Sequence, residues 1–165
     1  MGDLMIKKVC GFNISSIHFS VMILPYIKKE LKTEKNILTI LEENLEKNIN
    51  QILSKLTITD EERKEILDIN WDKTDIKEPA IEKHIREKIL QSNDVDIIIY
   101  GGEQYIKYAN KVISKIIKEN MKKNIKIIDC YSVRDFNENI KEILANHDIM
   151  FNTSGEHKIE EIFAG

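Results

Sequence analysis

The chain alternates between short runs of apolar, β-branched residues and longer stretches in which apolar residues recur every three or four positions. The first pattern is typical of buried strands and the second of amphipathic helices. Together they predict strand 5–12, a helix to about 31, strand 37–41, a helix after its cap Asn44, strand 66–71, a helix from Pro79, strand 95–100, a helix to about 122, strand 125–131, a short helix and strand 149–151.

The fold class follows from this alternation. The run from Val95 to Tyr100 is nearly continuous in apolarity, which favours a strand at the centre of a parallel sheet that is covered on both faces. Strands that alternate with helices through short polar turns indicate an open, mainly parallel sheet with helices on both faces. Because no repeat or linker interrupts the pattern, we expect one α/β domain over residues 1–165.

The segment from Val9 to Ile27 lacks Asp, Glu, Lys and Arg and is flanked by lysine pairs. A membrane anchor would share that pattern, but the polar and helix-bending groups in the segment do not suit hydrocarbon. These groups are Asn13, Ser15, Ser16, His18, Ser20 and Pro25. We therefore predict a buried strand, a turn and a buried helix, and no membrane association.

Composition excludes several function classes. Of 165 residues, 42% are apolar, and 25 basic against 28 acidic residues give a net charge of -3. That balance lacks the basic footprint of a nucleic-acid binder, so no direct nucleic-acid contact is expected. The two cysteines, Cys10 and Cys130, suggest reduced thiols in a cytoplasmic protein and exclude a four-cysteine zinc site.

In open α/β sheets, ligands bind beyond the carboxyl ends of the strands. A phosphate loop there needs several glycines and a Lys-Ser/Thr pair that opens the helix. The turn after the first strand, Gly11 to Ser16, has neither the second glycine nor the lysine. A nucleotide triphosphatase of that type is therefore disfavoured.

Two glycines, Gly101 and Gly102, follow the strand that ends at Tyr100, and Glu103 comes next. Their backbone N–H groups can approach an anion at a helix start. Glu103 opposes that reading because its own charge complements the helix dipole. The alternative is a tight turn between strand and helix that needs glycine conformations.

The strand that ends near Tyr131 carries a second set of candidates. Cys130 is either a reactive thiol close to Arg134 or a small buried hydrophobe. Tyr131 either lines a pocket or covers the sheet, and Asp135 is the expected cap of the following helix.

The four histidines show no metal-type spacing, and no Ser-His-Asp or Cys-His arrangement is recognisable. His18 lies in the apolar first helix, where it is either a hydrogen-bonded core residue or a sensing group. The pair Glu42-Glu43 after the second strand is not a specific catalytic signal. The sequence does not identify a cofactor, so the cofactor stays unknown at this point.

The last third of the chain resembles MEDS domains, the sensory domains named from methanogens, methylotrophs and the dichloromethane repressor. The residues that carry the resemblance are Asp129-Cys130-Tyr131, Arg134-Asp135-Phe136, Ile143-Leu144, His147 and Phe151 to Gly155, together with Leu24-Pro25-Tyr26-Ile27, Leu31, Glu34 and Leu67 to Asp75. The chain departs from the family pattern at Lys7-Lys8, Glu30 and Ser132. The resemblance implies a sheet similar to KaiC-like and RecA-like ATPase domains, without a working phosphate loop, that serves as a sensor. The periodicity alone leaves RecA/KaiC-like and Rossmann-like three-layer folds open.

The main hypothesis is a non-enzymatic sensory or signalling domain that binds a small ligand and passes the change to a protein partner, such as a kinase or a regulator. Its expected ligand-binding residues are Asn13, His18, Glu43, Gly101, Gly102, Glu103, Tyr131 and Arg134. One alternative is an enzyme for a nucleotide or other phosphorylated compound, with Glu43 or Glu103 as general base and Arg134 as anion clamp. The other is an interaction module, of which a homodimer is one form, that uses the aromatic residues Trp71, Tyr105 or Tyr108.

Overall fold

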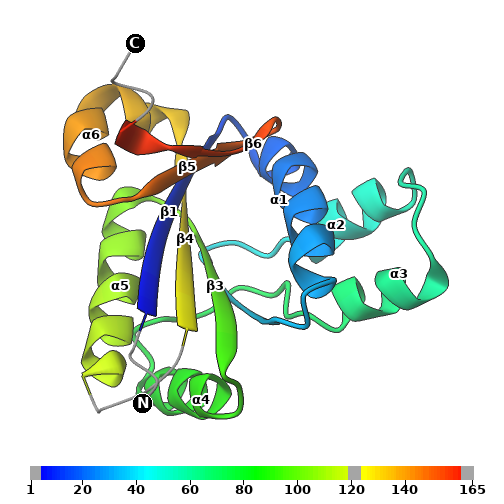
Figure 1. Cartoon of the computed structure of the whole chain (residues 1–165), viewed down its shortest axis with the longest axis horizontal. Coiled ribbons are helices and arrows are strands. Elements are labelled where there is room, and N and C mark those ends of the chain that lie inside the picture. The colour runs from blue at the N-terminus through cyan, green and yellow to red at the C-terminus, as the bar shows by residue number, and fades with distance from the viewer. Residues whose placement is uncertain (1–4, 119–123, 161–165) are drawn as a thin grey trace.

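The computed structural model describes residues 5–118 and 124–160, with the backbone alone at Met5 and at residues 135–138. In this part of the chain, six strands form one sheet in the order β2-β3-β4-β1-β5-β6 (Figure 1). The strands are β1 Met5–Asn13, β2 Asn36–Leu41, β3 Asp94–Tyr100, β4 Asn124–Ser132, β5 Ile149–Asn152 and β6 Gly155–Lys158. All neighbouring strands are parallel except β6, which runs antiparallel to β5. The expected open, mainly parallel α/β sheet is therefore confirmed.

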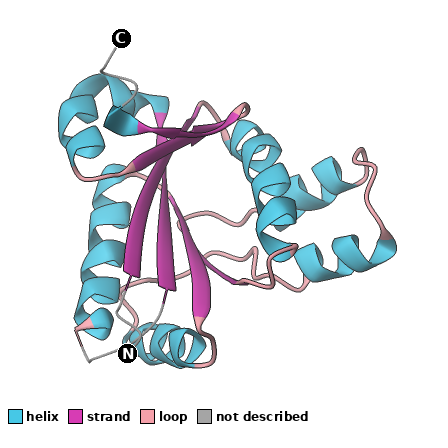
Figure 2. Ribbon diagram, viewed as in Figure 1, coloured by secondary structure: helices cyan, strands magenta, loops and turns pink. Residues whose placement is uncertain are grey.

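Helices cover both faces of the sheet, which gives three layers (Figure 2). Helices α1 Ser16–Leu31, α2 Glu46–Leu53 and α3 Asp60–Leu67 pack on one face, called here the α1 face. Helices α4 Pro79–Leu90, α5 Glu103–Ile117 and α6 Val133–Ala145 pack on the other, called the α5 face. Successive residues of a strand point to opposite faces, so Ile127 of β4 packs on the α5 face and Ile128 on the α1 face.

The uncharged segment 9–27 forms the end of β1, a turn and most of α1, as the sequence predicts. Ser15 caps α1, since its hydroxyl accepts a hydrogen bond from the backbone N–H of His18 at 3.1 Å. Pro25 lies inside α1 on its exposed side, where the missing backbone hydrogen bond faces water. No helix in the described ranges is both long and apolar enough to cross a membrane.

The expected cap of α2 is wrong by one residue. Leu45 occupies the N-cap position and offers no side-chain hydrogen bond, because its side chain has no polar atom and packs in the core. Asn44 instead accepts a 2.6 Å hydrogen bond from the backbone N–H of Lys73. Its polar side chain therefore tethers the loop that precedes α4.

The strand expected at 66–71 is also wrong. The acidic run at 60–62 begins α3, because Thr59 and Glu62 form a capping box, and Ile66 lies in the last turn of that helix. Trp71 follows in a loop, buried, with its indole N–H donating to the carbonyl of Ile66 at 2.9 Å. Because Trp71 is only 4% exposed, it does not offer the exposed aromatic surface that an interaction module would use.

Three further differences concern sheet order and ends. The strand expected at the centre, β3, is an interior strand next to the edge strand β2, and β4 and β1 form the central pair. Helix α6 begins at Val133 with Ser132 at the N-cap position, so Asp135 lies within the helix and is not its cap. Strand β6, Gly155–Lys158, follows a tight turn after β5 and was not predicted. Three of its four residues carry polar side chains, so the apolar pattern that identifies the other strands is absent there.

Candidate functional site

The carboxyl end of the sheet has two places where neighbouring strands lead to opposite faces. Strand β1 leads to α1 and its neighbour β4 to α6, while β2 leads to α2 and its neighbour β3 to α5. Such divergence opens the crevice in which doubly wound sheets bind ligands. The residues predicted from the sequence lie around these two crevices.

At the crevice between β2 and β3, the protein supplies its own anion. The carboxylate of Glu42 accepts a 2.8 Å hydrogen bond from the backbone N–H of Gly102, at the N-terminus of α5. A Cβ atom at Gly101 would lie 2.8 Å from that carboxylate oxygen, so glycine is needed for the close approach. Glu42 therefore occupies the position where the sequence suggested an external anion, and Glu43 beside it is exposed.

The crevice between β1 and β4 is bridged in a similar way. The buried Asn13 donates its amide N–H to the carbonyl of Tyr131 at 2.9 Å. In the turn that follows, the N–H of Ile14 donates to Nδ1 of His18 at 3.0 Å. A phosphate loop would direct such N–H groups at the ligand, whereas here His18 and Ser15 accept them.

The structure brings only two of the eight predicted residues, Glu103 and Tyr131, to the wall of one groove. This α5–α6 groove lies on the α5 face between the two helices and has a volume of about 300 Å³. Its lining residues are Lys8, Glu103, Ile106, Lys107, Asn110, Ser114, Asp129, Tyr131, Glu142, Ile143, Asn146 and His147. Arg134, at the start of α6, is exposed and is not part of that lining.

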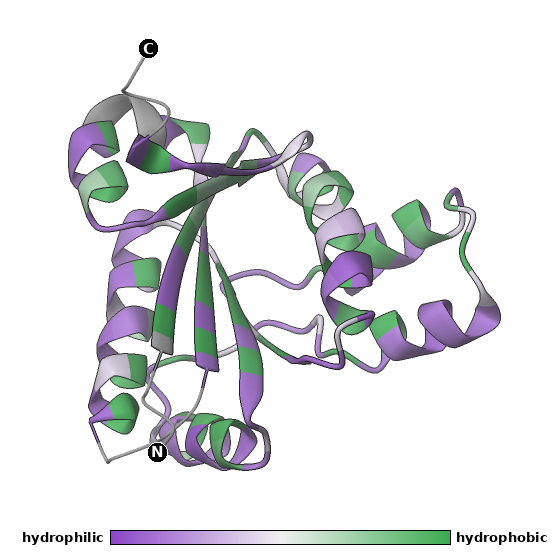
Figure 3. Cartoon of the chain, in the orientation of Figure 1, coloured by the Kyte–Doolittle hydropathy of each residue, from purple (hydrophilic) through white to green (hydrophobic). Residues whose placement is uncertain are grey.

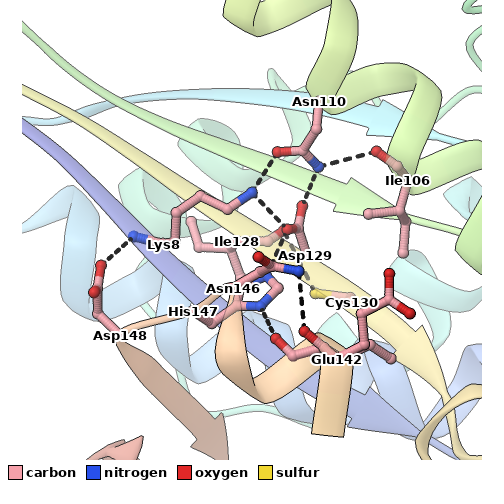
Figure 4. Close-up of polar contacts among 11 residues, drawn as sticks. Lys8, Ile106, Asn110, Ile128, Asp129, Cys130, Glu142, Asn146, His147 and Asp148 are labelled. Carbon is pink, nitrogen blue, oxygen red and sulfur yellow. Dashed lines mark hydrogen bonds and ion pairs between the residues drawn. The ribbon is translucent and has the colours of Figure 1, made fainter. Parts of the chain in front are cut away.

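A buried polar network forms the floor of the groove (Figure 4). The carboxylate of Asp129, 1% exposed, accepts hydrogen bonds from Lys8 Nζ at 2.9 Å, from His147 Nε2 at 2.7 Å and from Asn110 Nδ2 at 2.9 Å. Lys8 also donates to Asn110 Oδ1. The network thus joins β1, β4, α5 and the turn before β5 through one carboxylate.

Both ring nitrogens of His147 face acceptors. Nδ1 lies 2.5 Å from the carbonyl oxygen of Ile143, which can only accept, and Nε2 faces Asp129. Since Asp129 also accepts from a charged lysine and an amide, an ionised carboxylate and a doubly protonated imidazole satisfy every contact.

The electrostatics support an ionised Asp129. Burial alone would raise the pKa of Asp129, but the hydrogen bond from His147, the charge of Lys8 and the amide of Asn110 outweigh burial and hold the pKa below its usual value. At the edge of the network, burial and the nearby Asp129 raise the pKa of Tyr131, so its hydroxyl stays protonated.

The rim of the groove ties the two helices together. Lys107 lies 3.2 Å from Glu103 on its own helix and 3.7 Å from Glu142 on α6. Glu103 also accepts a 2.6 Å hydrogen bond from Asn139, the residue at which α6 leaves helical geometry, with φ of -129° and ψ of 27°. The kink of α6 is therefore fastened to α5 at the mouth of the groove.

Sequence reasoning missed most of the floor. Lys8 lies in β1, Asn110 in α5 and His147 in the turn before β5, and no motif spacing connects them. The strands of the sheet carry hydrophilic as well as hydrophobic positions (Figure 3). The available signal was Asp129, a charged residue within a buried run of β4, because such a charge needs partners. Cys130 beside it points to the α1 face, is buried, and has a pKa raised by burial, so it is a packed residue and not a reactive thiol.

No group of three or more His, Cys, Asp or Glu side chains that could hold a metal ion occurs among the described residues. The chain matches no model of a known protein family and no curated protein. Membership of the MEDS family therefore stays a prediction, and the case for function rests on the site.

Proposed function

We propose that this chain is a non-enzymatic sensory domain that binds a small polar ligand in the α5–α6 groove and passes the change to a protein partner. The observation that carries the proposal is the buried Asp129 network on the floor of that groove. Charged groups are costly to bury, and where they converge in a concave site they indicate function more often than elsewhere.

The chemistry of the floor favours a ligand with an acceptor oxygen, such as a carboxylate or a phosphate ester. A lysine ammonium has three N–H donors, and Lys8 directs two of them to Asn110 and Asp129. Its side chain is 24% exposed, so the third donor can reach a molecule in the groove. The hydroxyls of Tyr131 and Ser114 are further polar groups of the lining.

A binding role suits the floor better than catalysis. The side chain of His147 is 2% exposed and that of Asp129 is 1% exposed, whereas a general base has to reach the proton it removes. Both groups instead orient Lys8.

The same proposal includes a location in the cytoplasm, which fits two free, buried cysteines. It also includes a place within or near the MEDS-like sensors that the sequence resembles.

Transmission to a partner would run through α6. A ligand whose acceptor oxygen competes with Glu103 for the amide N–H of Asn139 weakens the contact between these two residues and so releases the kinked helix from α5. The partner is then a kinase, a regulator or a second copy of the chain that reads the position of α6.

The test is a thermal-shift screen of small organic carboxylates and phosphate esters at millimolar concentration, followed by NMR titration of each compound that raises the Tm. Lys8→Met should weaken binding at least about tenfold, since it removes a charge-assisted hydrogen bond. Lys7→Met is the matched control, because Lys7 is exposed and points to the other face. Tyr131→Phe against Tyr108→Phe repeats the comparison without touching the charge of Lys8.

Chemical shift changes at Lys8, Asn110 and Tyr131 that disappear in Lys8→Met support the proposal. It is wrong if no compound raises the Tm, or if both lysine variants bind equally well.

A further inference from the structure

A second buried charged cluster lies on the opposite, α1 face, near the amino ends of the strands. Asp96 of β3 is 1% exposed and Glu30 of α1 is 5% exposed, and both carboxyl groups face the ammonium of Lys35, which lies 2.8 Å from Glu30 Oε2 and 3.9 Å from Asp96 Oδ1. Lys126 of β4 is the direct neighbour of Asp96 across the two parallel strands. None of these residues belongs to the α5–α6 groove.

Two oxygens of this cluster lack a hydrogen-bond partner when both carboxyl groups are treated as acceptors. These are Asp96 Oδ2 and Glu30 Oε2. The ammonium of Lys35 lies 2.8 Å from Glu30 Oε2 as an ion pair, so Asp96 Oδ2 is the oxygen left with neither a hydrogen bond nor an ion pair among the described residues. A proton on Asp96 that is shared with Glu30 gives this oxygen a partner, which favours a carboxyl and carboxylate pair.

Several charged or titratable groups surround Asp96 from the elements packed against the pair. They are Tyr26 and Glu30 of α1, Lys35 before β2, Asp94 of β3, Lys126 of β4 and Glu156 of β6. Even with Asp96 protonated, the carboxylates of Glu30, Asp94 and Glu156 outnumber the ammonium groups of Lys35 and Lys126. Loss of the proton adds an uncompensated negative charge next to Glu30.

Lys126 connects this charge to the C-terminal hairpin formed by β5 and β6. Its ammonium donates to the Tyr26 hydroxyl oxygen at 2.8 Å, to Glu30 Oε1 at 3.5 Å and to Glu156 Oε1 at 3.2 Å. Glu156 is the only one of these partners that belongs to the hairpin. An ionised Asp96, adjacent in the sheet, competes with Glu156 for the same ammonium.

We propose that the Asp96 and Glu30 pair holds one proton at neutral pH, and that loss of this proton draws Lys126 away from Glu156 and loosens the β5–β6 hairpin. The cluster is then a proton-sensitive latch between the sheet and the hairpin. Burial, followed by the hydrogen bond and charge of Glu30, raises the pKa of Asp96 to about 8, with Lys35 and Lys126 opposing in part. The latch therefore opens on the alkaline side of neutral.

The test follows the carboxyl carbon of Asp96 by NMR from pH 5 to 10 and measures hydrogen-exchange protection of the β6 amides over the same range, corrected for intrinsic exchange. The Asp96 resonance should titrate well above its ordinary range. Protection in β6 should fall about fivefold through that titration, which is the size expected for loss of one partly buried ion pair.

Three variants separate the latch from a general effect of alkaline pH. Asp96→Asn mimics the protonated acid, so β6 protection should stay constant with pH. Glu30→Gln removes the neighbouring anion, so the Asp96 titration should move to lower pH. Asp94→Asn, two residues away on the same strand, should titrate as the wild type does.

An Asp96 carboxyl that titrates below pH 5, or a β6 hairpin that loosens equally in Asp96→Asn, overturns the proposal.

Discussion

His147 Nε2 lies 2.7 Å from Asp129 Oδ2 although strand β1 separates the strand of Asp129 from the strand that follows His147. The contact spans β1 on the α5 face, and Lys8 of β1 donates to the same oxygen of Asp129. One buried carboxylate thus fastens β4, β1 and the start of β5 together. The three strands meet where the α5–α6 groove has its floor.

Asp129→Asn should destabilise the protein strongly. An asparagine cannot accept from Lys8, His147 and Asn110 as a carboxylate does, and it leaves the ammonium of Lys8 without its anion. Breaking a buried pair on one side costs about 3–5 kcal/mol of unfolding free energy. Urea unfolding measures the loss. Glu142→Gln, at an exposed position on the rim, serves as control and should change stability by less than about 0.5 kcal/mol.

Acidification should remove the contribution of Asp129. The pKa of Asp129 is lowered in the folded protein, so the carboxylate stabilises the fold above the unfolded pKa of about 4 and loses that effect as pH falls through the folded value. The stability gap between wild type and Asp129→Asn should therefore narrow below about pH 4. Glu30, whose pKa is also lowered, adds to acid loss in both proteins, so each is compared in a Glu30→Gln background. A gap that stays constant from pH 7 to pH 3 would contradict an ionised Asp129.

Strands β1 to β5 were predictable because each contains a short run of apolar, β-branched residues. Continuous apolar runs such as Ile97 to Tyr100 are buried on both faces, and one sequence suffices to recognise them. The run 66–71 failed because its apolar residues are spread over a helix end and a loop, and a few apolar positions cannot distinguish these from a strand. Only tertiary packing around Trp71 decides the outcome there.

The candidate site was less predictable than the fold for a physical reason. Tyr131 and Glu103 were found because they follow strands, which is a local signal. Lys8, Asn110 and His147 meet at Asp129 only after β1, α5 and α6 have packed, and their separation along the chain exceeds 100 residues for Lys8. A charged residue inside a buried strand indicates that it has polar partners, but the sequence does not show which residues these partners are.

Glu42→Ala should weaken the start of α5. It removes the acceptor for the backbone N–H of Gly102, which is then left without its partner at the helix N-terminus. A lost helix cap costs about 0.5–2 kcal/mol of unfolding free energy. Glu43→Ala, one residue later and exposed, is the matched control and should stay within about 0.5 kcal/mol of wild type. Equal losses in the two variants would mean that general charge, and not this hydrogen bond, acts on α5.

Trp71 should report on the loop that replaces the expected strand. It is the single tryptophan of the chain and is buried, with its indole N–H bonded to the carbonyl of Ile66. The native protein should therefore emit at short wavelength and shift to longer wavelength on unfolding. Trp71→Phe keeps most of the apolar packing and removes the indole hydrogen bond, which contributes about 0.5–1.5 kcal/mol, while the carbonyl of Ile66 still accepts from the backbone N–H of Ile69. Native emission at the wavelength of an exposed indole would contradict the buried loop.

Gly11→Ala should be destabilising although alanine is small and Gly11 lies within a strand. A Cβ atom at that position would lie 2.2 Å from a ring carbon of Phe151, which packs across β1 from β5. Forcing an extra carbon into a filled core costs about 1–3 kcal/mol of unfolding free energy. Urea unfolding of the single variant measures this loss.

The double variant Gly11→Ala/Phe151→Leu tests whether that ring is the cause. Phe151→Leu alone should destabilise the protein by removing buried ring atoms, but it makes room beside residue 11. The double variant should then lose less stability than the sum of the two single variants, by about 0.5–3 kcal/mol for residues in contact. Strictly additive losses would show that the strain at Gly11 arises from its backbone and not from Phe151.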